Sequence, residues 1–72
     1  MKIFANQLKL IRKSNKLTQK QVANDTGIAE RAYQSYEGNE RKPTFENLIA
    51  LADYFDVSLD YLVGRSDNQK RL

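Results

Sequence analysis

The chain has 72 residues and a formal net charge of +3, and it contains neither cysteine nor histidine. Disulfides, the usual zinc sites, and the commonest nucleophile and general base of enzymes are therefore excluded. We expect a protein that is not an enzyme and binds no metal or cofactor. A domain of this size has little room for a deep small-molecule pocket. No apolar run approaches the roughly 18 residues of a membrane span, so we expect a soluble, cytoplasmic protein.

The charged residues are distributed unevenly along the chain. Residues 1–20 carry six cations and no acid, whereas residues 44–60 carry four acids and no Lys or Arg. The six cations are Lys2, Lys9, Arg12, Lys13, Lys16 and Lys20. This split predicts one basic face that meets a polyanion, although most charge runs are only solvated helix faces.

The first predicted helix covers residues 3–13. Phe4, Leu8 and Ile11 recur at helical spacing and share one face, which must be buried against another element. A polar turn at residues 14–16 separates this helix from the next one.

The second predicted helix begins near Gln19 and ends at Gly27. Thr18 and Gln21 have the spacing of a capping box, in which each side chain accepts a hydrogen bond from the other residue's backbone amide. Gly27 ends the helix because glycine adopts a left-handed conformation without steric penalty. The inner face consists of Val22, Ala23 and Thr26.

The third predicted helix covers residues 30–37. Ile28, Tyr33 and Tyr36 turn inward, and residues 38–39, Gly-Asn, end the helix because both tolerate a positive φ. With these apolar groups buried, a polar face points out of the domain. That outer face consists of Glu30, Arg31, Gln34 and Ser35.

Two more helices follow a loop at residues 40–43. Thr44 caps the fourth helix, and Ser58 caps a short fifth helix that ends at Gly64. Val57 and Leu62 stand at the two positions of a hydrophobic staple around the Ser58 cap. The apolar face of the fourth helix consists of Phe45, Leu48, Leu51, Ala52 and Phe55.

The predicted fold is all-α, with five short helices and no strand, followed by a flexible C-terminal tail at residues 65–72. A three-residue link centred on Gly27 forces the second and third helices to cross steeply, as in a helix-turn-helix. The small Ala23 side chain permits the close approach. The third helix is then presented by the rest of the domain.

At this point the sequence resembles a known family. Counted from Gln19, the alanine at position five, the glycine at position nine, and the apolar residues at positions four, ten, fifteen and eighteen match the helix-turn-helix of the lambda-repressor-like, or Cro/XRE-type, regulators. The blocks LKLIRK, TQKQVA, YEGNERKP and LADYFDVSLDYLVG also follow the family's order. The resemblance implies a compact five-helix domain over residues 1–64, with the motif at about 19–38 and a recognition helix at about 30–37.

The resemblance implies a sequence-specific double-stranded DNA-binding transcriptional regulator, a repressor of bacterial or phage type. Its third helix would lie in the major groove of an operator, and the protein would act as a homodimer, in some cases only on DNA. The base-facing residues implied are Glu30, Arg31, Gln34 and Ser35. The implied phosphate contacts are Gln19, Asn39, Arg41 and Lys42, with Lys20 a weaker one.

Each of these residues also has a simpler explanation. The base-facing set alone is an ordinary polar helix surface, Gln19 alone is a helix N-terminus, and Arg41 and Lys42 alone are loop cations. Three acids within eight residues suggest a cation site, but helix surfaces and helix N-termini explain them better. These acids are Asp53, Asp56 and Asp60.

Several positions concern packing. The resemblance implies a structural ion pair between Arg12 and Glu37, which joins the first helix to the end of the third. Ala29 stands where the family usually has a Ser or Thr cap, so the third helix begins less firmly. Thr26 and Tyr33 replace aliphatic residues, and their hydroxyls need partners. Leu10, in a position that is usually polar, is either an exposed residue of no consequence or part of a partner surface.

A second function stays open at this stage, that of a protein-interaction module, antitoxin-like or an adaptor. Glu30 on the presented face and the acidic second half keep this alternative open. Steep salt dependence of DNA affinity would distinguish the two functions. The candidate dimer surface, whose residues alternatively close the core, consists of Tyr54, Leu59, Tyr61 and Val63.

Overall fold

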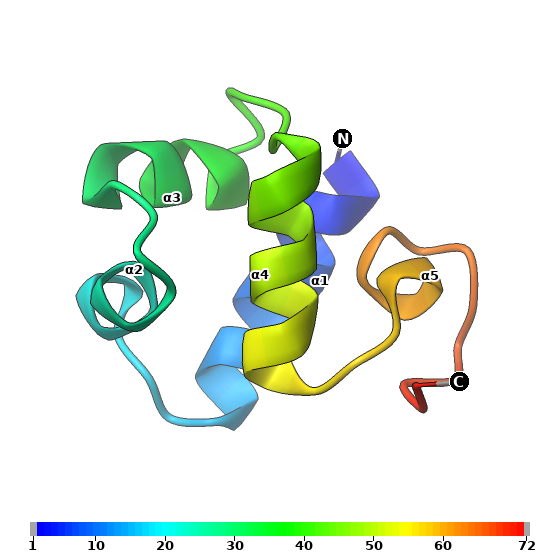
Figure 1. Ribbon diagram of the computed structural model, residues 1–72. Helices are drawn as coiled ribbons and strands as arrows, with labels where there is room; N and C mark the ends of the chain where they lie inside the picture. Colours follow the sequence, from blue (N-terminus) through cyan, green and yellow to red (C-terminus); the bar gives the residue numbers. More distant parts are fainter. Residues whose placement is uncertain (1, 72) are drawn as a thin grey trace.

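The computed structural model describes residues 2–71, which form five α-helices and no strand (Figure 1). The helices are α1 (Lys2–Ser14), α2 (Gln19–Thr26), α3 (Glu30–Glu37), α4 (Phe45–Phe55) and α5 (Leu59–Leu62). The predicted all-α fold is therefore confirmed, and the first, second, third and fifth helices lie within two residues of their expected bounds. None of the helices in this part of the chain is long and apolar enough to cross a membrane.

The predicted caps form because they depend only on neighbouring residues. The capping box of Thr18 and Gln21 is complete, with the Gln21 amide donating to the Thr18 hydroxyl over 3.1 Å. Thr44 and Ser58 also accept from the third residue of their helices. Ala29 makes no side-chain cap bond, as expected.

Gly38 and Asn39 follow the last residue of α3, as predicted, but only Asn39 has a positive φ. Gly38 has a φ of −80°, whereas Asn39 has a φ of 59° and takes the left-handed conformation. Asparagine tolerates this conformation better than most residues do. The turn after α3 therefore requires Asn39 more than Gly38.

The core lies between α1, the α2–α3 pair, α4 and α5. In Figure 1, α4 and α1 run through the middle, with α2 and α3 on one side and α5 on the other. Most side chains of the predicted inner faces are buried there, and the largest fully buried side chains are Tyr33, Phe4, Leu8, Leu51, Leu62 and Val22. The Phe4 and Tyr36 rings pack edge to face, with centroids 6.3 Å apart.

One expected core residue lies outside the core. Phe45, predicted on the apolar face of α4, is 71% exposed. It is the first residue of α4, so no preceding turn of the same helix covers it. The other four residues predicted on that face are buried or partly buried.

The predicted tail lies against the end of α4 and the start of α5 over part of its length. The Ser58 amide donates to the Gln69 carbonyl over 2.9 Å, and Arg71 donates to the Ala52 carbonyl and the Asp53 carboxylate. Just before this segment, Gly64 has a φ of 84°, and a Cβ atom there would collide with Ile3. The flexibility of residues 65–72 concerns motion and stays a prediction, and Leu72 lies outside the described residues.

We expect Ala23→Leu to lower the free energy of unfolding by about 1–3 kcal/mol, because Ala23 is 1% exposed at the α2–α3 crossing and a larger side chain overpacks it. Asn24→Leu, at the next and exposed position of α2, is the control and should change stability by less than about 0.5 kcal/mol. Urea unfolding measures both. Equal midpoints for the two variants would contradict the close-approach role of Ala23.

Candidate nucleic-acid interface

The polar face of α3 points away from the core, as the sequence predicts. Glu30, Arg31 and Gln34 are exposed and Ser35 is partly exposed. Figure 1 shows α3 at one side of the molecule, away from α5 and the C-terminal segment. The four residues proposed to read bases therefore lie together on one open helix face.

Two hydrogen bonds within α3 involve the side chains of this face. The Gln34 amide donates to the Glu30 carboxylate over 3.4 Å, and the Ser35 hydroxyl donates to the Arg31 carbonyl over 3.0 Å. The first bond is long and exposed, so it holds neither side chain firmly. The Glu30 and Gln34 side chains can therefore change conformation when a partner binds.

The loop between α3 and α4 carries the second group of predicted contacts. Asn39, Arg41 and Lys42 are all exposed. These residues follow directly after α3, so the Arg41 and Lys42 cations and the Asn39 amide flank the C-terminal end of that helix. Lys20, the weaker candidate, is exposed on the first turn of α2.

Gln19 is connected to α3 through Glu37. Its Nε2 donates to Glu37 Oε1 over 3.1 Å, although the two residues are 18 positions apart in sequence. The side chain therefore braces the end of α3. An amide nitrogen has two donor hydrogens, so this bond leaves one of them for a second acceptor.

The predicted ion pair between Arg12 and Glu37 is confirmed. Arg12 Nε and Nη2 donate to the two carboxylate oxygens over 2.6 and 3.0 Å, in a bidentate pair. Arg12 Nη1 also donates to the Leu17 carbonyl over 2.9 Å, which fixes the link between α1 and α2. Glu37 is only 5% exposed, so the pair lies inside the domain.

Tyr33 completes this cluster. Its hydroxyl donates to Glu37 Oε2 over 2.5 Å, and its side chain is completely buried. Sequence reasoning missed this bond, although the four-residue spacing within one helix was a signal that could have found it. Thr26 finds a partner as well, because its hydroxyl donates to the Val22 carbonyl over 2.7 Å. Among the described residues no buried side-chain nitrogen or oxygen lacks a hydrogen bond.

The cluster changes the acidity of its members. Burial alone would raise the pKa of Glu37, but the hydrogen bonds from Arg12, Tyr33 and Gln19 outweigh it and lower the pKa below its ordinary value of 4.5. Burial raises the pKa of Tyr33, and its bond to the Glu37 carboxylate raises that pKa further. Glu37 is therefore ionised and Tyr33 neutral at pH 7, which is the combination in which the hydroxyl donates to the carboxylate.

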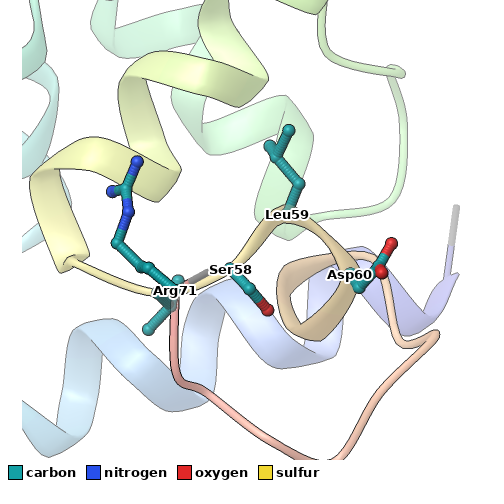
Figure 2. A pocket seen from close by; sticks show the side chains of 5 residues that line it. Ser58, Leu59, Asp60 and Arg71 are labelled. Atoms are coloured by element: carbon teal, nitrogen blue, oxygen red, sulfur yellow. The ribbon is translucent and has the colours of Figure 1, made fainter.

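Surface hollows lie on the other side of the molecule. One of about 340 Å³ is lined by five residues around the start of α5. Figure 2 shows the Leu59, Asp60 and Arg71 side chains there pointing away from one another, so they do not converge on a ligand. Arg71 instead pairs with Asp53 over 2.6 Å. No cluster within residues 2–71 has the three His, Cys, Asp or Glu side chains that would hold a metal ion.

The candidate dimer surface is partly contradicted. Tyr61 is 9% exposed and belongs to the core, so it closes the core and does not form a surface. Tyr54 is partly buried, and its hydroxyl donates to Asp25 over 2.7 Å, which joins α4 to α2. Leu59 is 38% exposed and Leu10 is 59% exposed.

Comparisons with known proteins agree with this geometry. A family model described as helix-turn-helix matches residues 8–62. The chain belongs to this family, that of the lambda-repressor-like, Cro/XRE-type regulators. The HTH-type transcriptional regulator YobD of Bacillus subtilis is 39% identical over 66 residues, which are 92% of this chain and 59% of that protein. The cryptic phage CTXphi transcriptional repressor RstR of Vibrio cholerae is 46% identical over 86% of this chain and 52% of its own length.

A solved structure supports the same fold. The P22 c2 repressor protein, crystallised with a synthetic operator, is 27% identical and superposes with a TM-score of 0.83. The match covers 92% of this chain and all of that chain. The chain spans less than three fifths of the length of the two curated relatives, YobD and RstR.

We expect removal of one partner of the buried ion pair to be worse than removal of both. Arg12→Met leaves the Glu37 charge buried without its main partner, and should lower the free energy of unfolding by about 3–5 kcal/mol. Adding Glu37→Gln removes that charge and should restore part of the loss. Thermal or urea unfolding of the two single variants and the double variant measures this. Additive losses would contradict it.

The stability that Glu37 contributes should depend on pH. Because folding lowers the pKa of Glu37, its contribution is complete above the ordinary value of 4.5 and is lost as the pH falls towards the folded-state pKa. The difference in unfolding free energy between the wild type and Glu37→Gln should therefore be largest near neutral pH and shrink below about pH 4.5. Glu40→Gln, at an exposed carboxylate, controls for the loss of one acid. A difference that stays constant down to pH 3 would refute the lowered pKa.

Proposed function

We propose that the chain is a sequence-specific double-stranded DNA-binding transcriptional regulator, a repressor of bacterial or phage type, that reads the major groove with α3. The observation that carries this proposal is the arrangement of α3. Its inner face is fixed by Tyr33, Tyr36 and Glu37, while its polar face is open. Relatives named as regulators and repressors, and a similar repressor solved with its operator, support it.

The chemistry of the open face suits base recognition. Arginine is the usual bidentate partner of guanine and glutamine that of adenine, while a glutamate accepts from the cytosine amine. Arg31, Gln34 and Glu30 supply these three groups, and Ser35 supplies a short hydroxyl. We assign Arg31 the largest share of discrimination, because its two-pronged contact has the most demanding geometry.

Phosphate contacts would come from the elements beside α3. Arg41 and Lys42 supply exposed cations, and Asn39 supplies an amide in the same loop. Gln19 stands at the N-terminus of α2, where unpaired backbone amides and the helix dipole favour an anion. Such contacts fix the position of the protein on the duplex and carry no sequence information directly.

The partner would be an operator with two-fold symmetry, bound by a homodimer that in some cases forms only on DNA. Half-sites one helical turn apart, about 34–36 Å, would match such a dimer. A regulator of this kind works in the cytoplasm of a bacterial or phage-infected cell, and is not an enzyme.

A second candidate function is that of a protein-interaction module. Phe45 and Leu10 are 71% and 59% exposed, and they would favour a protein partner if they formed one contiguous apolar patch, since single exposed apolar side chains are common. DNA binding is better supported, because these two residues are not part of the open face of α3.

Selection of bound duplexes from a random-sequence pool, at two salt concentrations, tests the proposal. We expect recovery of a two-fold symmetric site whose affinity falls steeply with salt, since neutralised phosphates release counterions. Weak, salt-insensitive binding without sequence preference would refute it and favour the protein-interaction module.

Two arginine variants should separate base recognition from phosphate contact. Arg31→Ala should weaken binding to the selected site by about 1–3 kcal/mol and relax the preference at one base pair. Arg41→Ala should weaken binding to all sequences alike and reduce the salt slope by about one. Arg65→Ala removes an exposed cation far from α3 and is the control. A uniform loss for Arg31→Ala would make Arg31 a phosphate contact.

A further inference from the structure

We infer that Tyr33 is a positioning residue for DNA binding, whose hydroxyl acts through Glu37 to hold the Gln19 side chain ready for a phosphate. This inference rests on the proposed function, in which Gln19 contacts the DNA backbone. Tyr33 is completely buried and touches no DNA in this arrangement. Its effect on binding would therefore be indirect.

The geometry joins Tyr33 to Gln19 through one carboxylate. Tyr33 donates to Glu37 Oε2 over 2.5 Å, and Gln19 donates to Glu37 Oε1 over 3.1 Å. The two oxygens belong to one rigid plane, so rotation of the carboxylate moves both. The short bond from Tyr33 to Oε2 therefore also fixes the position of Oε1. Because the Gln19 amide bonds to Oε1, the position of that amide is fixed as well.

Arg12 alone fixes the carboxylate less completely. Its bonds to the two oxygens are unequal, 2.6 Å to Oε2 and 3.0 Å to Oε1. Tyr33 reinforces the Oε2 side from within α3 itself, four residues before Glu37. The two donors approach from different helices, and together they determine the orientation of the carboxylate.

Holding Gln19 matters because its side chain is long and only partly buried. A glutamine that is already fixed loses less conformational freedom when it binds, and such preorganisation increases affinity. One hydrogen of the Gln19 amide is used on Glu37, and the other is available for a phosphate oxygen. The amide is neutral, so this contact adds to affinity without adding to the release of counterions.

Tyr36 provides a matched control on the same helix. It is 2% exposed, and its hydroxyl accepts a bond of 2.8 Å from Asn47 of α4. Both tyrosines are buried and hydrogen-bonded, but the partner of the Tyr36 hydroxyl is Asn47, whereas that of Tyr33 is Glu37. Tyr33→Phe and Tyr36→Phe each remove one hydroxyl and keep the ring. They differ mainly in the hydrogen bond that is lost, which is the bond to Glu37 in the first variant and the bond from Asn47 in the second.

The experiment is a double-mutant cycle in DNA affinity, at a temperature where urea unfolding shows every variant to be folded. Affinities of the wild type, Tyr33→Phe, Gln19→Ala and the double variant are measured on the selected operator and on a scrambled duplex. We expect Tyr33→Phe to weaken binding to both duplexes by the same factor, roughly 3- to 10-fold, with an unchanged salt slope. In the Gln19→Ala background it should have no further effect. Tyr36→Phe should leave affinity unchanged.

The opposite results would overturn the inference. Additive effects of Tyr33→Phe and Gln19→Ala would show that Tyr33 does not act through Gln19. Equal losses for Tyr33→Phe and Tyr36→Phe would assign both hydroxyls to stability alone. A wild type that binds no DNA would overturn the proposed function together with this inference, whereas a wild type that binds its operator while the cycle is additive would overturn the inference only.

Discussion

The structure depends on the Glu37 carboxylate, which is buried and accepts four hydrogen bonds from three helices. Arg12 of α1 supplies two, Gln19 of α2 supplies one, and Tyr33 of α3 supplies the fourth. A buried carboxylate without partners would cost several kcal/mol. The three helices must therefore meet in the one arrangement that satisfies it, which fixes how α3 lies against α1 and α2.

This constraint is needed because α3 is too short to be stable alone. An isolated helix of eight residues is far below the length at which helices persist in water, and α3 also lacks a side-chain N-cap. Its order comes from Tyr33 and Tyr36 in the core and from Glu37 at its end. The inner face of α3 thus stabilises the helix, and the residues of the outer face are available for binding.

The sequence predicted the structural features that depend on neighbouring residues, such as the helix caps. It failed for features that depend on contacts between residues far apart in the chain. The Thr18 box and the Thr44 and Ser58 caps follow from spacing alone, and the ion pair of Arg12 and Glu37 followed from the resemblance. Periodicity placed Phe45 in the core, but periodicity cannot show that no other element covers the first turn of α4. The bond of Arg71 to the end of α4 depends on how the chain folds back after α5. The roles of the exposed residues on α3 stay predictions, because an open polar face is equally stable whatever it binds.

The two groups of proposed DNA contacts differ in how they are held, and the difference follows from their targets. Base edges present donors and acceptors at fixed places, so discrimination requires a rigid carrier. Glu30, Arg31 and Gln34 stand on such a carrier, a helix fixed from behind by the Glu37 cluster. Phosphates repeat along the backbone, so cations on a loop, such as Arg41 and Lys42, can reach them without a fixed orientation. Gln19 would be the exception, a phosphate contact held as firmly as the recognition helix. Because one carboxylate holds both, a shift of Glu37 would move the proposed phosphate contact and the proposed reading helix together.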